Sequence, residues 1–189
     1  ILDQEELKIF KVPKFTPPSP SSKFGIIKPS SIKVFENNFE DRDVSNGEYI
    51  GNYYIKNGEL YLQKGSYIIG NLSVQNFILR FNVRIIKFGG RVQDGLQIKL
   101  NQQNSTRYLR LDMRKNGLII WFSNGTGLTR LASSNISIKE NIEYEIEIKL
   151  SESTINVFLD GVERLTGKGL YGYVGKITLE AINSDVVID

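Results

Sequence analysis

The chain of 189 residues contains no cysteine and no histidine, and it has a single methionine and a single tryptophan. Without these residues it has no means of building a Ser-His-Asp or Cys-His catalytic site, a zinc site of the ordinary ligands or a thiol redox centre. Most enzyme classes are therefore excluded, and the sequence predicts a protein that is not an enzyme. Two kinds of chemistry stay open, carboxylate-based glycoside hydrolysis and an oxygen-ligand calcium site.

Charge and hydropathy exclude two classes of partner. The 24 basic and 21 acidic residues give a net charge of +3, and the two signs are interspersed along the chain. This pattern does not indicate a nucleic-acid partner. No apolar run reaches the roughly 20 residues that a membrane-spanning helix needs, so no membrane span is predicted.

Proline is confined to the beginning of the chain, because all five prolines lie within the first 29 residues. A Pro- and Ser-rich stretch is an extended connector. The sequence therefore predicts an N-terminal tail over residues 1–31 and a domain over residues 32–189. In the tail, residues 7–12 can form a β-strand that needs an open sheet edge, either on its own domain or on another molecule. Its strand-forming side chains are Leu7, Ile9, Phe10 and Val12.

From residue 33 onward the hydrophobic residues recur with a period of two, which is typical of half-buried β-strands. Residues 77–85 and 108–114 show this alternation clearly. Six Asn-Gly or Asp-Gly pairs separate the apolar runs, and such pairs favour tight hairpin turns. No segment of ten residues has a helical stripe. The predicted fold is all-β, with two antiparallel sheets packed face to face.

The order of these segments resembles the concanavalin A-like (laminin G-like) jelly roll. The segments that carry the resemblance are residues 57–62, 76–81, 93–98, 108–111, 144–148, 155–161 and 172–179. The resemblance covers about residues 33–189 and implies a jelly-roll sandwich. The superfamily includes lectins, carbohydrate-binding modules, glycoside hydrolases and scaffolding domains, so it implies little about activity.

One strand carries a candidate hydrolase pattern. Glu143, Glu145 and Glu147 alternate on one face, with neighbouring carboxylates about 6.5 to 7 Å apart, and this spacing resembles the Glu-x-Asp-x-Glu strand of the jelly-roll glucanases. The central residue here is Glu rather than Asp. A solvated outer face of a strand explains the same pattern, and a glycoside hydrolase is the less favoured function.

A calcium site is a further candidate. Asp41 follows the first domain strand and Asp189 ends the chain. If the first and last strands pair, as the resemblance implies, these two carboxylates would converge on one hard cation. Acidic residues are also ordinary turn formers at strand ends.

Carbohydrate binding needs aromatic side chains on an exposed face or loop rim. The candidates are Trp121, Tyr171 and Tyr173. Aromatic residues in strands also build cores, so each of them has a structural explanation. The arginines at positions 80, 84, 107, 110 and 114 are interpreted as polar faces of two strands.

Four Asn-x-Ser/Thr triplets begin at Asn71, Asn104, Asn124 and Asn135. All four lie in turn-like segments between apolar runs, as N-glycosylation acceptors should. They predict a secreted glycoprotein with covalent N-glycans, although turns that are rich in Asn and Ser would contain similar triplets without being glycosylated.

The predicted chain has an N-terminal strand, then a linker, then a glycosylated all-β domain. This organisation resembles that of the archaeal thread and pilus subunits that assemble by donor-strand complementation. The predicted function is an extracellular structural subunit of a surface filament. It would polymerise head to tail with copies of itself by donating residues 7–12 to the next sandwich. The alternative is a secreted carbohydrate-binding, lectin-like module.

Overall fold

The computed structural model describes residues 24–27, 33–37, 39, 47–72, 76–151, 153–169 and 174–189. Within these segments the chain forms antiparallel β-strands and no helix. It follows that none of the described elements is a helix long and apolar enough to cross a membrane. The predicted all-β sandwich is confirmed.

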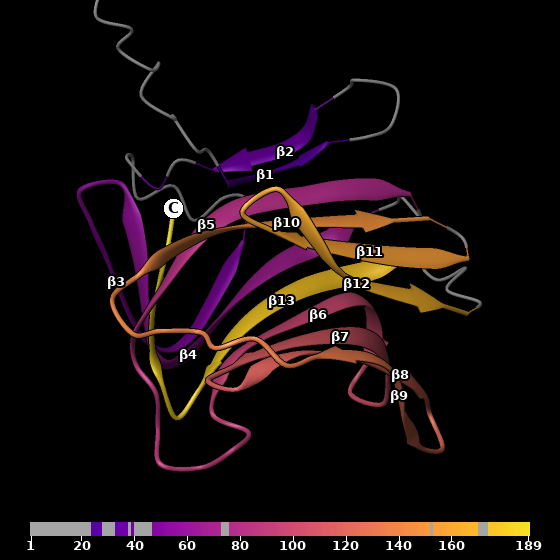
Figure 1. Cartoon of the computed structure of the whole chain (residues 1–189). Helices are drawn as coiled ribbons and strands as arrows, with labels where there is room; N and C mark the ends of the chain where they lie inside the picture. Colours follow the sequence, from indigo (N-terminus) through magenta and orange to yellow (C-terminus); the bar gives the residue numbers. More distant parts are fainter. Residues whose placement is uncertain are drawn as a thin grey trace, which may run out of the picture.

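The strands form two packed layers, which Figure 1 shows one above the other. The upper layer, here the β5 sheet, has the order β12-β11-β10-β5-β14-β4. The lower layer, here the β7 sheet, has the order β4-β13-β6-β7-β8-β9. The strands of the β5 sheet are β5 (Phe77–Lys87), β10 (Glu143–Leu150), β11 (Thr154–Leu159), β12 (Val162–Lys168) and β14 (Asp185–Ile188). Those of the β7 sheet are β6 (Gly95–Asn104), β7 (Arg107–Arg114), β8 (Gly117–Asn124), β9 (Leu128–Ser134) and β13 (Gly175–Ile182).

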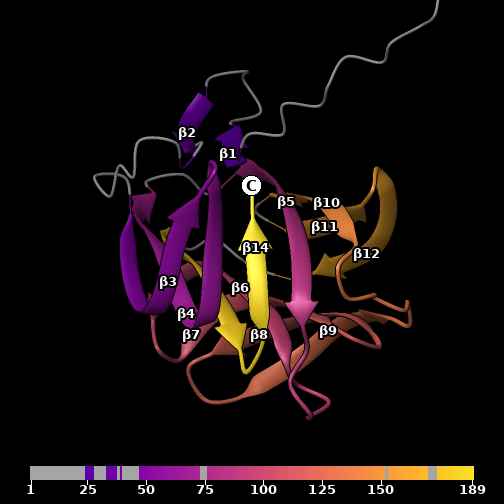
Figure 2. The same ribbon diagram turned by 90° about the vertical axis from the view of Figure 1, so that its left-hand side faces the viewer.

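Strand β4 (Glu59–Leu72) belongs to both sheets. Its residues 60–63 pair with β14, and its residues 66–72 pair with β13. Strand β3 (Glu48–Lys56) follows the other edge of β4 and bends with it at Gly51, whose φ of 85° favours glycine. A Cβ on Gly51 would lie 3.1 Å from the Cα of Gly65, so two glycines let the strands approach closely at the bend. The β3–β4 ribbon thus carries the chain from one layer to the other, beside β14 (Figure 2).

The core lies between the two layers and is built from the residues that the alternation predicts. On β5 the alternating side chains are almost completely buried, and so are those on β7. These residues are Phe77, Leu79, Phe81, Val83, Ile85, Leu109, Leu111 and Met113. Burying apolar area at about 25 cal/mol per Å² is what drives the two sheets together. Because side chains alternate, the intervening residues of the same strands face outward.

Two of the predicted hairpin turns occur as expected. Residues 57–58 and 160–161 are two-residue turns that join paired strands, and all four residues have positive φ, between 52° and 78°. The pair at residues 116–117 is different. There the turn residues are Lys115 and Asn116, and Gly117 already pairs with Arg114. The expected turn position is therefore wrong by one residue.

The predicted donor residues Leu7, Ile9, Phe10 and Val12 lie outside the described segments. Strand β1 (Phe24–Ile27) lies on the N-terminal side of the expected boundary between residues 31 and 32, and it pairs with both β2 (Lys33–Asn37) and β5. On β5, β1 opposes residues 78–80 and β14 opposes residues 83–87. The two strands therefore lie end to end along one edge of β5.

Candidate functional site

The outer face of the β7 sheet carries the most organised group of polar side chains among the described residues. Because Leu109, Leu111 and Met113 point into the core, strand β7 turns the residues between them outward. On the neighbouring strand β8, Trp121 lies opposite Arg110. The name Trp121 face is used here for Arg110, Asp112, Arg114 and Trp121.

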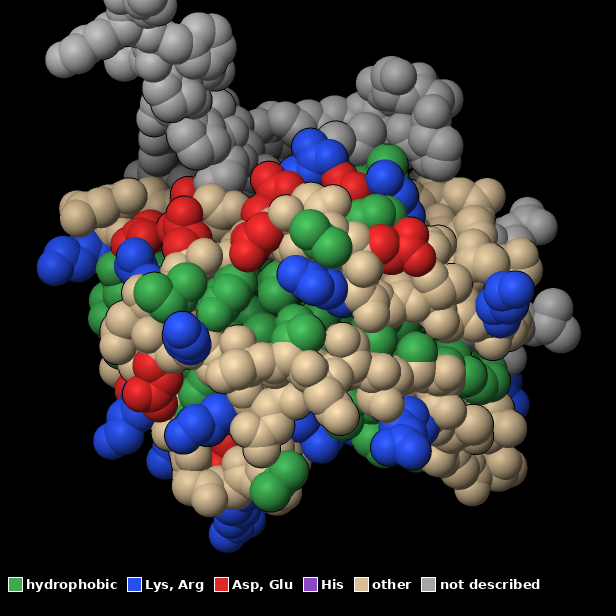
Figure 3. Space-filling model, in the orientation of Figure 1, with side chains coloured by type: hydrophobic (Ala, Val, Ile, Leu, Met, Phe, Trp, Pro, Cys, Tyr) green, Lys and Arg blue, Asp and Glu red, His purple; other side chains and the backbone are tan. Residues whose placement is uncertain are grey.

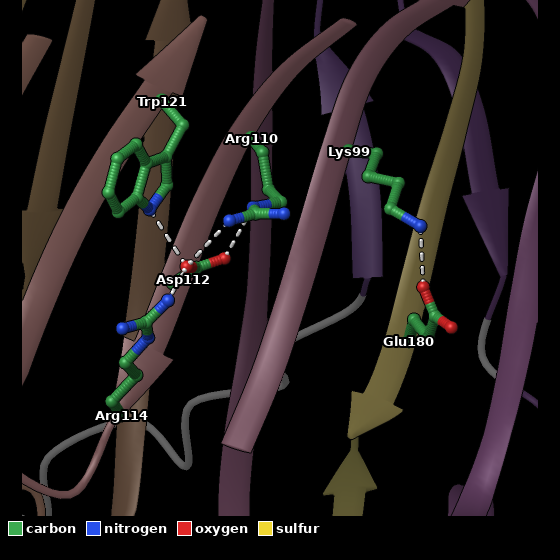
Figure 4. Close-up of polar contacts among 6 residues, drawn as sticks. All are labelled: Lys99, Arg110, Asp112, Arg114, Trp121 and Glu180. Atoms are coloured by element: carbon green, nitrogen blue, oxygen red, sulfur yellow. Dashed lines mark hydrogen bonds and ion pairs between the residues drawn. The ribbon is translucent and has the colours of Figure 1, made fainter. Parts of the chain in front are cut away.

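Asp112 is the centre of the Trp121 face, with only 1% of the residue exposed (Figure 4). Its Oδ2 atom accepts a hydrogen bond from Nε1 of Trp121 at 2.8 Å and from Nη2 of Arg110 at 3.2 Å. It also accepts one from Nη2 of Arg114. The Oδ1 atom lies 2.8 Å from Nε of Arg110. One buried carboxylate thus orients two guanidinium groups and an indole ring, and charge-assisted bonds of this kind are the stronger ones.

The arginine and the indole ring also contact each other. The guanidinium carbon of Arg110 lies 5.6 Å from the centroid of the Trp121 ring, which is within the range of a cation–π contact. Both arginines keep only a small part of their side chains exposed, 13% for Arg110 and 16% for Arg114. The ring is therefore held in one orientation on the surface of the sheet.

A second polar pair continues the row across the sheet. Lys99 of β6 lies opposite Arg110 and forms an ion pair with Glu180 of β13, with 2.6 Å between Nζ and Oε2 (Figure 4). The Lys99 ammonium also lies 6.0 Å from the ring centroid of Tyr108. Side chains from β13, β6, β7 and β8 thus form one continuous polar surface.

A hollow of about 160 Å³ adjoins the Trp121 face. It is named here the Arg130 hollow, and Arg114 belongs both to its lining and to the Trp121 face. Arg130 lies on β9 directly opposite Trp121. The lining residues are Val92, Arg114, Asn116, Gly117, Ile119, Arg130, Ser133, Ser134 and Asn135. The lining contains two cations and several neutral hydrogen-bonding groups, and no carboxylate.

The structure places only part of the predicted carbohydrate site. Trp121 lies on the outer face of the β7 sheet, whereas Tyr171 and Tyr173 lie outside the described segments. Two other tyrosines, Tyr53 and Tyr54, are exposed at 41% and 43% on the edge strand β3. Tyr54 stacks on Tyr61 with 4.5 Å between the ring centroids, and a hydrogen bond to the Glu59 carboxylate raises the Tyr61 pKa.

The three candidate hydrolase carboxylates lie on the outer face of β10, since the residues that alternate with them, Tyr144, Ile146 and Ile148, are buried in the core. Glu143 accepts a hydrogen bond from Nδ2 of Asn82 at 3.2 Å. This arrangement agrees with the interpretation as a polar outer face.

Glu147 is held by two cations on the β5 sheet. Nε of Arg80 donates to its Oε2 at 2.9 Å, and Nζ of Lys149 lies 3.0 Å from its Oε1. Burial raises the pKa of Glu147, but the hydrogen bonds from Arg80 and Lys149 outweigh burial and hold the pKa below its ordinary value of 4.5. A carboxyl group with a lowered pKa is ionised at neutral pH and is poorly suited to act as a general acid.

The calcium prediction is only partly covered by the described residues. Asp189 exchanges two backbone hydrogen bonds with Asn82, of 2.8 and 3.1 Å, so the chain end is paired with β5. Asp41 lies outside the described segments. In the part of the chain that the structure describes, no three acidic side chains gather in a way that could hold a metal ion.

Three of the four predicted glycosylation asparagines, Asn104, Asn124 and Asn135, are exposed. Oδ1 of Asn104 accepts hydrogen bonds from the backbone N and the hydroxyl of Thr106, and Asn124 binds Thr126 in the same way. The fourth, Asn71, lies in β4 and not in a turn as expected.

Sequence reasoning missed the Trp121 face. It interpreted Arg110 and Arg114 as a polar strand face and did not single out Asp112. A usable signal was present, because Arg-x-Asp-x-Arg places opposite charges on one face of a strand. A two-residue turn at residues 115–116 then brings Trp121 opposite Arg110.

Several solved structures share this fold, although no protein-family model and no curated protein sequence matches the chain. The carbohydrate binding module CBM66 from Bacillus subtilis has a TM-score of 0.63 at 11% identity, over 76% of this chain and 92% of that one. The carbohydrate recognition domain of Emp47p has a TM-score of 0.63 at 13% identity, over 90% and 95%. The Ca2+-bound exoplasmic/lumenal domain of VIP36 has a TM-score of 0.59 at 9% identity, over 86% and 83%. Identities this low show the fold alone, and the fold is a jelly-roll β-sandwich consistent with the concanavalin A-like resemblance.

Proposed function

We propose that this domain is a secreted carbohydrate-binding, lectin-like module that binds a sugar on the Trp121 face. The observation that carries the proposal is a half-buried indole ring on the outer face of the sheet, held by a hydrogen bond to the buried Asp112. Sugar sites combine an apolar ring that packs on the C–H face of a pyranose with a few placed polar groups that bind its hydroxyls. Arg110 and Arg114 supply such groups beside the ring.

The rigidity of the Trp121 face supports binding. Ordering a long side chain on association costs about 0.5–1.5 kcal/mol. Here Asp112 already orders both arginines and the indole before any ligand arrives. The binding free energy is therefore not spent on ordering them. The structural neighbours named for carbohydrate binding or recognition add support to this proposal.

The test is a Trp121→Ala variant measured by isothermal titration calorimetry against a panel of soluble oligosaccharides. Removing a central aromatic anchor costs about 2 kcal/mol, which weakens affinity about 30-fold. Tyr54→Ala is the matched control, because Tyr54 is an exposed aromatic on β3 that pairs with the part of β4 belonging to the β5 sheet, and not with the sheet that carries the Trp121 face. Equal affinity of the Trp121→Ala variant and the native protein would show that the Trp121 face is not the site.

The exposed Asn104 and Asn124 turns agree with N-glycosylation in a secreted protein, and both acceptors stay predictions. A calcium ion held by Asp189 together with Asp41 also stays a prediction. Soaking the protein with CaCl₂ and measuring its thermal stability, with and without a chelator, tests for that ion, because a ligand that binds only the folded state raises its stability.

A second function, filament assembly by strand donation, is favoured by one observation. β1 pairs with β5 at residues 78–80, in line with the end of β14, so this edge accepts a strand from the N-terminal part of the chain. The same kind of pairing between copies would extend into a filament. Electron microscopy of the native chain and of a variant lacking residues 1–12 separates the functions. The deletion should abolish filaments and leave sugar affinity unchanged. Trp121→Ala should weaken sugar affinity and leave filament formation unchanged. Filaments formed by the shortened chain would exclude donation of residues 7–12.

A further inference from the structure

We propose that the Arg130 hollow binds an anionic group of the sugar, a carboxylate or a sulfate, so that the ligand is an acidic saccharide. This inference rests on the proposed function, because it names the chemical class of the ligand for the same surface. The anion and the sugar ring would be bound side by side, since Arg130 in β9 lies directly opposite Trp121 in β8.

The charge of the lining favours an anion. Arg114 and Arg130 line the hollow together with four neutral polar side chains, and no acidic side chain is among the lining residues. The four polar residues are Asn116, Ser133, Ser134 and Asn135. Guanidinium groups match carboxylate and sulfate oxygens in geometry as well as in charge. Hydroxyl and amide groups can donate to the remaining oxygens.

The cations of the hollow are not fully neutralised by carboxylates of the described segments. Among the described residues Asp112 is the one carboxylate in contact with Arg114, and it already shares its single charge with Arg110. The side chain of Arg130 has no ion pair or hydrogen bond with any residue of the described segments, although its backbone belongs to the β8–β9 ladder. Nε of Arg114 is buried and also lacks an acceptor among them. The hollow therefore keeps a net positive charge that an anion would compensate.

The charges on the wider surface around the hollow also favour an anion. On the outer face of the β7 sheet, the cations outnumber the carboxylates. The cations include Lys99, Arg110, Arg114 and Arg130, and the carboxylates are Asp112 and Glu180. Figure 3 shows that, on the side it displays, acidic side chains gather mainly on the upper layer, whereas basic ones are spread over both layers. Surface charge of one sign raises the local concentration of a ligand of the opposite sign.

The size of the hollow also suits a small anionic group. Its volume is about 160 Å³. Since a water molecule takes up about 30 Å³, there is room for a carboxylate or sulfate group with a few waters. Ile119 and Val92 supply apolar contacts at its wall, and Val92 is 74% exposed.

The experiment compares matched ligands on the full chain by isothermal titration calorimetry. The probes are trigalacturonic acid and its methyl ester for the carboxylate, and a chondroitin disaccharide with and without its sulfate for the sulfate. We expect at least one anionic probe to bind about 10- to 100-fold more tightly than its neutral partner, as one charge-assisted contact implies. Raising NaCl from about 0.05 to about 0.5 M should reduce that preference, because the Debye length falls well below 10 Å.

The variant is Arg130→Gln, which removes the charge and keeps hydrogen-bond donors. It should remove most of the preference and leave the affinity for the neutral probe unchanged. Arg164→Gln is the control, since Arg164 is exposed on β12 and does not line the hollow. It changes the net charge by the same amount and should have no effect.

The outcomes separate the two proposals. If the acidic probe and its neutral partner bound with equal affinity, and Trp121→Ala abolished the binding of both, this inference would be overturned and the carbohydrate proposal would stand. Failure of every probe and of the whole oligosaccharide panel would overturn both. Binding of a DNA duplex as tight as that of the acidic sugars, and equally sensitive to Arg130→Gln, would show a general polyanion surface and would also overturn the inference.

Discussion

Replacing Asp112 with asparagine tests how strongly the Trp121 face depends on one carboxylate. The substitution keeps the size of the side chain and removes its charge. The new amide group can accept at one atom only, and its NH₂ would face donors of Arg110, Arg114 or Trp121. Two guanidinium groups would then lose their counter-ion while most of each side chain stays buried.

The magnitude follows from these contacts. A hydrogen bond to a charged group contributes about 1.5–3 kcal/mol, and removing one partner of a buried ion pair costs about 3–5 kcal/mol. Arg110 and Arg114 are 13% and 16% exposed, so water screens part of the unpaired charge. We therefore expect Asp112→Asn to lower the free energy of unfolding by about 2–4 kcal/mol at neutral pH.

The assay is urea unfolding followed by far-ultraviolet circular dichroism. Glu180→Gln is the comparison, because it also removes one carboxylate from the outer face of the same sheet. Its partner Lys99 and Glu180 itself are 21% and 30% exposed, and such a pair contributes only about 0–1 kcal/mol. If Asp112→Asn lowered the free energy of unfolding by less than about 0.5 kcal/mol, the size of an ordinary surface substitution, the reasoning on the buried carboxylate would be refuted.

Two further predictions concern the β5 sheet and the ribbon. The lowered pKa of Glu147 implies a stabilisation that is present above the unfolded pKa and is lost as the pH falls through the folded pKa. Glu147→Gln should therefore cost about 0.5–1 kcal/mol at pH 7 and progressively less as the pH falls below 4.5; a cost that does not change with pH would contradict the ion pairing. A Cβ on Gly65 would lie 2.6 Å from the backbone oxygen of Asn52, so Gly65→Ala should cost about 1–3 kcal/mol. Gly70→Ala on the same strand meets no atom within 4 Å and should change the free energy of unfolding by less than about 0.5 kcal/mol; similar losses in both variants would show that the bend at Gly65 is not sterically constrained.

The core of the fold could be predicted from the sequence because burial on a strand alternates locally. Phe77 to Ile85 show this without any knowledge of their partners. The bend of β4 at Lys64 and Gly65 could not be predicted in the same way, because it depends on two different strands that pair with one strand in succession. Lys64 has a φ of 55°, and nothing in its side chain signals that conformation.

The Trp121 face illustrates what local patterns leave open. An Asn-Gly turn at residues 116–117 would place Asp112 opposite Trp121, whereas the observed turn at residues 115–116 places Arg110 there. The burial of Asp112 is also not a property of its strand, since outward positions of a half-buried strand normally meet water. It results from the long side chains of its neighbours, which cover it only once the register is set.

The position of the single tryptophan makes the protein its own optical probe. With one indole in the chain, at residue 121, tryptophan emission comes from the outer face of the β7 sheet alone. A molecule that covers the ring changes its contact with water, and a change at Asp112 alters the hydrogen bond to its Nε1 atom. Ligands can therefore be titrated, and events at this surface told apart from unfolding elsewhere, without attaching a label.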